Sequence, residues 1–264
     1  MKTVAIVGYG VVGKAYHKVF PEAIIYDPYQ PEGKNTTKDQ VNACDVVLVA
    51  VFTPYKNGVL DTTIVEEVIG WIESPLIIIK SALYPGTTDR LVKETGKRIA
   101  VSVEYIGEGN YPVHFWKYPH QEDPRYHQML VVGGEEDVAE EACQFMWRKL
   151  SPDIKIHKVT ALEAEIVKLI ENSYGALKVT FANTFLSLAE KSNTSFVRLH
   201  QAWNSDPRTD SMHLRAVSHD RGWVSKCWDK DVPALVGYAK SIGAYDTAKL
   251  FQTIIDLNKG HLNE

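Results

Sequence analysis

Cysteine is scarce in this chain, which argues against a disulfide framework. The 264 residues include only three cysteines, Cys44, Cys143 and Cys227, which are odd in number and widely spaced. A disulfide scaffold shows an even set of cysteines, and a zinc site shows pairs such as Cys-x-x-Cys. We therefore expect a reduced cytoplasmic protein with no metal among its cofactors.

Excess positive charge and long apolar runs are missing as well. The formal net charge is −4, whereas nucleic-acid-binding domains normally carry a basic surface. No apolar run approaches the roughly 20 residues that span a bilayer. The short strand pattern that starts directly after Met1 lacks a signal-peptide cleavage site. We expect no nucleic-acid partner and no membrane association.

Short β-branched runs alternate with helical patterns over residues 1–158. Several runs are apolar throughout, as strands are when helices cover both faces of the sheet. Repeated strand–helix–strand units predict an α/β, Rossmann-type domain with a doubly wound, mostly parallel sheet. The expected strands are Thr3–Val7, Ala23–Tyr26, Val46–Val51, Leu76–Lys80, Ile99–Val103, Met129–Val132 and Ile154–His157, and the expected helices include Thr63–Ile72, Thr87–Glu94 and Glu136–Leu150.

A second domain is predicted over residues 159–264. It begins with one long helix over 161–191, which contains no proline and carries apolar residues at helical spacing. A polar, irregular segment over Ser205–Asp231 and two helices, Val232–Ser241 and Tyr245–Lys259, complete this small helical domain. Because part of the long helix is available to a second subunit, we expect a homodimer formed through residues 161–191.

A glycine motif follows the first expected strand and opens a helical pattern, which is the context that supports a dinucleotide-binding loop. In such a loop Gly8 allows a tight turn, Gly10 lets the pyrophosphate approach the backbone, and Gly13 lets helix and strand pack closely. Asp27 ends the second strand 19 residues after Gly8, where a carboxylate binds the adenosine ribose. No arginine stands beside Asp27 to bind a 2′-phosphate, so the predicted cofactor is NAD. The predicted loop residues are Gly8, Tyr9, Gly10, Val11, Val12 and Gly13.

Three reactive side chains occur in the second half of the sequence. Lys168 and Asn172 are four residues apart on the long helix and therefore project from the same face. Cys227 is flanked by Lys226 and Lys230, and nearby cations favour a thiolate. This pattern makes Cys227 a candidate nucleophile, although a lone cysteine is more often a small buried apolar residue.

Taken together, these segments resemble the UDP-glucose/GDP-mannose (nucleotide-sugar) dehydrogenases along nearly the whole chain. Their order and rough spacing match that family. The matching segments are Val4–Gly13, Phe52–Pro54, Lys80–Thr88, Glu104–Gly109, Ala164–Asn172, Asp206–Arg208 and Cys227–Asp231.

The resemblance implies an NAD-dependent oxidation of a primary alcohol of a sugar or sugar nucleotide to the acid, in two hydride transfers. Cys227 would attack the intermediate aldehyde, and the second hydride transfer would leave a thioester that water releases as the acid. Lys168 and Asn172 would stabilise the developing oxyanion. Asp231 and Glu108 would handle protons and position water.

The resemblance also implies binding contacts. Thr53 and Pro54 would line the nicotinamide, and Glu104 and Lys230 would contact the substrate. Arg208 would reach a substrate bound by the neighbouring subunit, so that the homodimer is the functional form.

The chain departs from the family pattern in several places. Ala82 stands where the family has threonine, Val224–Lys226 replaces a glycine-rich approach to the cysteine, and Asp229 replaces a proline. The family also continues into a second α/β domain that binds the nucleotide, so the sequence resembles a shortened form.

Two other functions stay open at this stage. A β-hydroxyacid or 6-phosphogluconate-type dehydrogenase also carries a lysine and an asparagine four apart but needs no cysteine. A non-catalytic NAD-binding homologue is the second alternative, which Ala82 and the shortened form favour.

Overall fold

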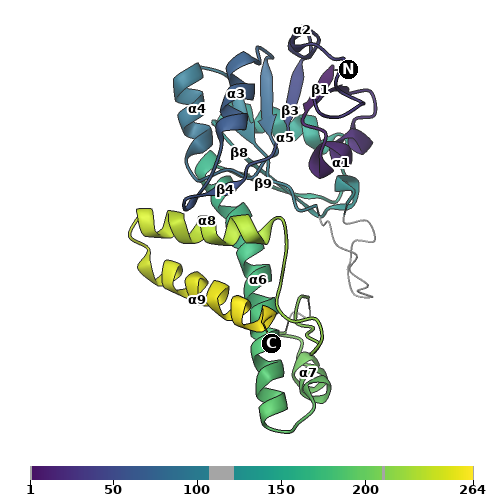
Figure 1. Cartoon of the computed structure of the whole chain (residues 1–264). Coiled ribbons are helices and arrows are strands. Elements are labelled where there is room, and N and C mark those ends of the chain that lie inside the picture. Colours follow the sequence, from purple (N-terminus) through teal and green to yellow (C-terminus); the bar gives the residue numbers. More distant parts are fainter. Residues whose placement is uncertain (1, 107–121, 210–211, 264) are drawn as a thin grey trace. The chain divides into compact units, whose positions relative to one another are not determined.

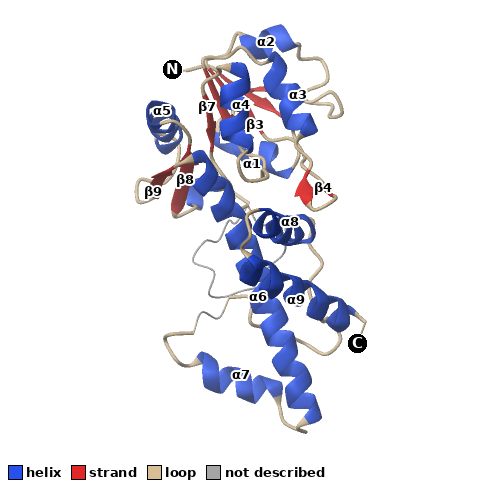
Figure 2. Ribbon diagram, turned by 90° about the vertical axis from the view of Figure 1, so that its left-hand side faces the viewer, coloured by secondary structure: helices blue, strands red, loops and turns tan. Residues whose placement is uncertain are grey.

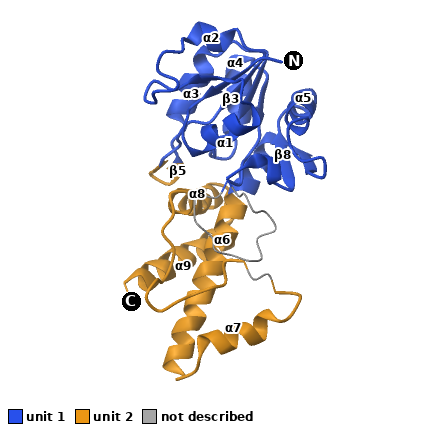
Figure 3. Cartoon of the chain, turned by 90° about the vertical axis from the view of Figure 1, so that its right-hand side faces the viewer, with its two compact units in different colours: residues 1–54, 60–168 blue, residues 55–59, 169–264 orange. Residues whose placement is uncertain are grey.

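The protein is described from a computed structural model, which covers residues 2–106, 122–209 and 212–263. These residues form two compact units, which Figure 3 shows in blue and orange. Unit 1 contains residues 1–54 and 60–168, and unit 2 contains residues 55–59 and 169–264. The domain limit after residue 158 stays a prediction, whereas the compact units divide ten residues later, after Lys168.

Unit 1 is built on a seven-stranded sheet, and the α/β, Rossmann-type fold predicted from the sequence is confirmed (Figure 1). The strand order is β2-β1-β3-β6-β7-β8-β9, with every pair parallel except β7 and β8. All seven predicted strands are present, each with ends shifted by at most two residues. Their bounds are β1 Val4–Val7, β2 Ile24–Tyr26, β3 Val46–Val49, β6 Leu76–Ile79, β7 Ile99–Val101, β8 Met129–Gly133 and β9 Lys155–Val159.

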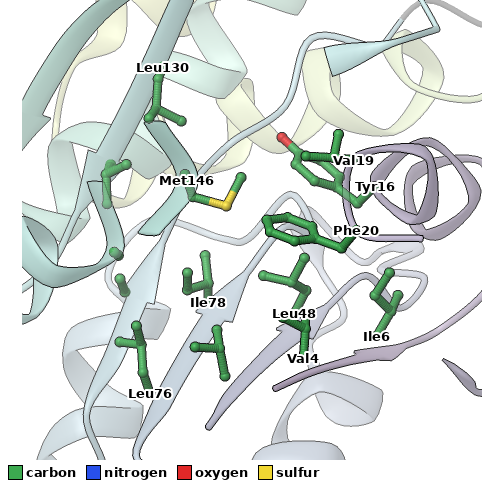
Figure 4. Packing of buried hydrophobic residues seen from close by; sticks show 14 of the residues in the cluster. Val4, Ile6, Tyr16, Val19, Phe20, Leu48, Leu76, Ile78, Leu130 and Met146 are labelled. Carbon is green, nitrogen blue, oxygen red and sulfur yellow. The ribbon is translucent and has the colours of Figure 1, made fainter. Parts of the chain in front are cut away.

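The central strands are apolar throughout because both faces of the sheet are covered. Successive residues of a strand point to opposite faces, so Ile6, Leu48 and Ile78 join one core and their neighbours join the other. The first core includes side chains of the helices α1 (Val11–Val19) and α5 (Glu136–Trp147). Figure 4 shows Tyr16, Val19 and Phe20 beside the strand residues of this core.

The opposite face of the sheet packs against α2 (Lys38–Asn42), α3 (Thr63–Trp71), α4 (Thr87–Thr95) and the start of α6 (Ala161–Lys191). A short 3-10 helix, η1, spans Pro124–Tyr126. Predicted helices α3, α4 and α5 are confirmed, although α5 ends at Trp147 rather than Leu150.

Unit 2 is helical. The 31-residue helix α6 has the predicted bounds Ala161–Lys191, and the residues after Lys168 belong to this unit. It is followed by α7 (Phe196–Asn204), α8 (Trp228–Ser241) and α9 (Tyr245–Leu262). Helices α8 and α9 pack on each other (Figure 2). The sequence reasoning missed α7, whose start is capped by the Ser195 side chain.

Helix α8 begins four residues before the predicted start at Val232. The last residues of the segment expected to be irregular, Trp228–Asp231, are therefore its first turn. The physical reason is local, because Ser225 and Asp229 supply hydrogen bonds that satisfy backbone groups at the start of this helix.

Most of a β-hairpin from the first part of the chain, residues 55–59, belongs to unit 2. Strand β4 (Tyr55–Lys56) contacts α8 and pairs with β5 (Val59–Leu60). The turn residues Asn57 and Gly58 both have positive φ, 54° and 92°, as a type I′ hairpin turn requires. At the contact with α8, a Cβ on Gly237 would lie 1.9 Å from the Gly58 carbonyl oxygen, so only glycine fits there.

None of the helices in the described ranges is both long enough and apolar enough to cross a membrane.

Candidate functional site

The three motif glycines occupy different environments, all in unit 1. Gly8 has φ +93°, and a Cβ there would lie 2.5 Å from the Ala50 carbonyl oxygen. A Cβ on Gly13 would lie 2.0 Å from the Gly8 carbonyl oxygen, whereas a Cβ on Gly10 would meet nothing within 4 Å. Gly8 and Gly13 are thus required by the protein's own packing, and Gly10 leaves open space beside the backbone.

The start of α1 faces this open space. Gly10 is the N-cap residue of this helix. Because glycine has no side chain, it cannot cap the N–H groups of the first turn. Unpaired N–H groups at the positive end of a helix dipole form an anion site. The space beside Gly10 and the start of α1 together fit a dinucleotide pyrophosphate.

Asp27 is held by the glycine loop itself. One carboxylate oxygen accepts the Tyr9 N–H at 2.8 Å, and the other accepts the Tyr29 N–H at 2.9 Å. Gly33 packs so closely on this turn that a Cβ there would lie 2.4 Å from the Asp27 nitrogen. Each carboxylate oxygen has a second lone pair, so the oriented Asp27 can also accept hydrogen bonds from ribose hydroxyls.

The loops after β3 and β6 are bonded to each other. Buried Thr53 donates its hydroxyl to the Ala82 carbonyl at 2.7 Å, and Ser81 donates to the Val51 carbonyl at 2.7 Å. The Pro54 carbonyl accepts the Asp61 N–H at 2.7 Å. Ala82 lacks the hydroxyl of the threonine that the family has at this position. Its backbone carbonyl still accepts the hydrogen bond from Thr53.

Glu104 and Lys168 meet in a buried cluster of unit 1. The Lys168 ammonium donates to the Glu104 carbonyl at 2.6 Å and lies 3.5 Å from the Glu104 carboxylate. It also lies 5.2 Å from the centre of the Tyr105 ring. The Glu104 carboxylate accepts the Ile106 N–H at 2.6 Å. The structure thus pairs Glu104, which the resemblance assigns to substrate binding, with Lys168, which it assigns to stabilising the oxyanion.

Lys80 is a buried cation in unit 1 that the sequence reasoning did not assign to the site. Its side chain donates to the Ser102 hydroxyl at 3.0 Å and lies 4.3 Å from the centre of the Tyr16 ring. Burial lowers the pKa of Lys80 to about 7; the Glu104 charge opposes this shift, and Lys168 adds to it. The available signal was a lysine at the end of a fully apolar strand, where a charge is costly.

Glu165 is the second buried group that sequence reasoning did not single out. Its carboxylate accepts the Gly86 N–H at 2.5 Å, the Thr88 N–H at 2.8 Å and the Thr88 hydroxyl at 2.7 Å. Burial raises the pKa of Glu165, and these hydrogen bonds oppose the shift. Glu165 thereby caps α4 and fixes the helical turn that carries Lys168.

In unit 2 the buried carboxylate of Asp231 has two side-chain partners. It accepts the Asn172 amide at 2.6 Å and the Lys230 ammonium at 2.6 Å. Asn172 lies one helical turn beyond Lys168 on α6. The structure thus brings together three of the predicted site residues, Asn172, Lys230 and Asp231.

Cys227 is partly buried and immediately precedes α8. Lys226 beside it is exposed, and the charge of Lys230 is paired with Asp231. The N-terminus of α8 is a further source of positive potential near the thiol, because the helix dipole has its positive end there.

Two predicted site residues remain, Arg208 and Glu108. Arg208 is 88% exposed in its side chain and forms a bidentate pair with Asp206, two residues away, at 2.5–3.1 Å. Glu108 lies outside the described residues.

Comparisons with known proteins point to one family. A family profile described as the UDP-glucose/GDP-mannose dehydrogenase family, central domain, matches residues 162–260. UDP-glucose 6-dehydrogenase of Rickettsia bellii is 28% identical over 88% of this chain and 51% of its own length. UDP-N-acetyl-D-mannosamine dehydrogenase of Methanocaldococcus jannaschii is 29% identical over 69% of this chain and 39% of its own length.

A UDP-glucose dehydrogenase structure from Pyrobaculum islandicum superposes with a TM-score of 0.77 at 22% identity, and covers 98% of this chain and 68% of that one. This likeness concerns the fold. The chain spans about half the length of the curated relatives named above. Residues 162–260 match the model of the central domain of the UDP-glucose/GDP-mannose dehydrogenase family, and the family resemblance predicted from the sequence is confirmed.

Proposed function

We propose that this chain is an NAD-dependent dehydrogenase that oxidises a primary alcohol of a sugar nucleotide to the acid through a thioester on Cys227. The observation that carries the proposal is the arrangement at the start of α8. There Cys227 directly precedes α8, and Asp231 in the first turn of this helix pairs with Asn172 of α6. These residues lie within the segment that matches the family profile.

The cofactor proposal rests on unit 1. Gly10 and the start of α1 can hold the pyrophosphate, and Asp27 can hold the ribose hydroxyls. A carboxylate at this position favours NAD over NADP because it repels a 2′-phosphate. Tyr9, Val11, Val12, Thr53 and Pro54 complete the proposed cofactor contacts. When bound at these residues, NAD would supply the hydride acceptor for both oxidation steps.

The chain's own residues supply the remaining chemistry. The Cys227 thiolate adds to the aldehyde carbon, and the carbonyl electron pair moves to oxygen. Lys168 and Asn172 stabilise that negative charge with an ammonium and an amide N–H. After hydride departure has left the thioester, water adds to its carbonyl carbon, Asp231 or Glu108 accepts the proton, and the thiolate leaves. One alcohol, one water and two NAD thus give one acid, two NADH and two protons.

The substrate contacts and the assembly are also proposals. Glu104 and Lys230 are proposed to contact the sugar nucleotide, and Arg208 to serve the neighbouring subunit. A homodimer through α6 is supported by apolar side chains that this helix exposes. The cytoplasmic location stays a prediction.

The experiment combines stoichiometry with a cysteine substitution. The purified chain is incubated with NAD and either UDP-glucose or GDP-mannose, and NADH and acid are quantified by absorbance and mass spectrometry. We expect two NADH per acid, and a rate at least about 10³-fold lower for Cys227→Ser. Cys143→Ala is the control, because burial raises the pKa of the Cys143 thiol to about 11 and removes it as a nucleophile.

Two outcomes would contradict the proposal. One NADH per substrate with an active Cys227→Ser variant would favour the β-hydroxyacid type of reaction. NAD binding without turnover of either sugar nucleotide would favour a non-catalytic homologue.

A further inference from the structure

Helix α9 holds the segment that precedes Cys227 in the sequence. The buried Asn258 side chain accepts the Trp223 N–H at 2.8 Å and donates to the Trp223 carbonyl at 2.9 Å. The Trp223 indole donates to the Thr180 hydroxyl on α6 at 3.0 Å. Trp223 is therefore fixed in both its backbone and its ring, four residues before Cys227.

The other side of Cys227 is held by Trp228. Its ring packs on Gly175 of α6, where a Cβ would lie 2.6 Å from the ring. It also lies edge-on to Trp223, with ring centres 6.0 Å apart. The two tryptophans anchor the ends of a short segment, Val224–Cys227, in which the family has glycines.

Within this segment, Ser225 and Asp229 bond to the backbone in a reciprocal way. The Ser225 hydroxyl accepts the N–H groups of Cys227 and Trp228, both at 3.3 Å. The Asp229 carboxylate accepts the Ser225 N–H at 3.2 Å. Such an exchange between a serine and an acidic residue in the first helical turn satisfies backbone donors that a helix start leaves open.

We propose that Ser225 and Asp229 are positioning residues that hold Cys227 at the start of α8 for its role as the nucleophile. This inference rests on the proposed function, because it assigns a task to two residues that depart from the family pattern. The Ser225 hydroxyl bonds the Cys227 nitrogen directly, so it fixes the backbone from which the thiol projects. The positive end of a helix dipole favours the thiolate form of a nearby cysteine over the thiol.

The charge of Asp229 acts against the thiolate, so its hydrogen bond and its charge have opposite effects. Burial raises the pKa of Asp229, and the bond from Ser225 opposes that shift. The variants Asp229→Asn and Asp229→Ala both remove the charge, and only asparagine keeps an acceptor of similar reach. The ratio of their rates therefore isolates the hydrogen bond.

The test is peptide-resolved alkylation of the full chain by iodoacetamide between pH 5 and pH 10. Mass spectrometry separates Cys227 from the buried Cys44 and Cys143, and the pH profile yields both the thiol pKa and the limiting rate. For Ser225→Ala we expect a higher thiol pKa and a rate at pH 7 lower by about 3- to 10-fold. Asp229→Ala is expected to react at least about 3-fold more slowly than Asp229→Asn at the same pH.

The matched control is Ser241→Ala, which removes a serine hydroxyl bonded to the Tyr238 carbonyl at the other end of α8. It should leave the Cys227 profile unchanged. The proposal is overturned if Ser225→Ala alkylates within 2-fold of the unaltered chain, or if the two Asp229 variants react equally. Failure of sugar-nucleotide turnover would leave these alkylation results intact, so the two proposals can fail separately.

Discussion

Unit 1 and unit 2 differ in how they bury apolar side chains. In unit 1 the residues of β1, β3 and β6 are buried along their whole length. In unit 2 the long helix α6 exposes large apolar side chains on one face, with Ile170 and Leu188 each 53% exposed. The sheet unit completes its own core, whereas an exposed apolar stripe of this kind marks an interaction surface.

Three carboxylates of the two units differ in the donors that orient them. In unit 1 Asp27 and Glu165 are oriented by backbone N–H groups. In unit 2 Asp231 is oriented by the side chains of Asn172 and Lys230. Backbone donors come with the fold, and side-chain donors must be supplied by particular residues.

The largest effect is expected from Gly13→Ala, which tests whether unit 1 depends on close packing inside the glycine loop. The new methyl group would overlap the Gly8 carbonyl oxygen, so we expect the free energy of unfolding to fall by about 3 kcal/mol or more in urea titrations. Gly10→Ala is the matched control, because its methyl group meets nothing within 4 Å.

Gly10→Ala should keep its stability but lose about 10-fold in NAD affinity by calorimetry, since the methyl group fills the space beside the pyrophosphate. Equal NAD affinity for Gly10→Ala and the unaltered chain would remove the assignment of this loop as the dinucleotide site.

The next effect concerns the exposed stripe of unit 2, formed by Ile170, Tyr174, Phe181 and Leu188 on α6. The double substitution Ile170→Lys with Leu188→Lys places two charges on it. We expect the dissociation constant of the proposed homodimer to rise by about 100-fold or more, as it does when hot-spot residues of an interface are lost. Sedimentation velocity over a concentration series measures this.

The control for the stripe is Ile242→Lys, since Ile242 is 60% exposed but follows α8 rather than lying on α6. It should leave the dimer intact. A monomeric unaltered chain would contradict the proposed homodimer.

The smallest effect is expected from Lys80→Met in the core of unit 1. Lys80 is 1% exposed and its pKa is lowered to about 7, against about 10.4 in an unfolded chain. Between these values the unfolded state binds more protons, so stability rises with pH. Below pH 7 the full cost of the buried charge applies, and the cost disappears as pH approaches the unfolded value.

Relative to Lys80→Met, the unaltered chain should therefore gain about 2 kcal/mol of unfolding free energy between pH 7 and pH 9. Urea titrations at several pH values measure the difference. Parallel stability curves for the two proteins would show that Lys80 keeps an ordinary pKa, with its charge compensated inside unit 1.

Much of unit 1 could be predicted because its signals are local. An apolar run such as Leu76–Ile79 indicates a strand buried on both faces, and Gly8, Gly10 and Gly13 indicate a loop between strand and helix. The β4–β5 hairpin was not predicted, because its two-residue strands are too short to show a periodic pattern. The Asn57–Gly58 pair was the usable signal, since both residues accept positive φ.

The sequence alone determined the strands, the glycine loop, the long helix and the family resemblance. These depend on residue spacing and on backbone constraints within a few residues of each other. Only the tertiary structure decided which polar groups meet, as with Glu165 and Thr88, 77 residues apart, or Asn172 and Asp231, 59 apart. The periodicity of apolar residues indicates which side chains are buried. It does not indicate which polar groups bond to a buried charge, because those contacts form only when distant segments pack together.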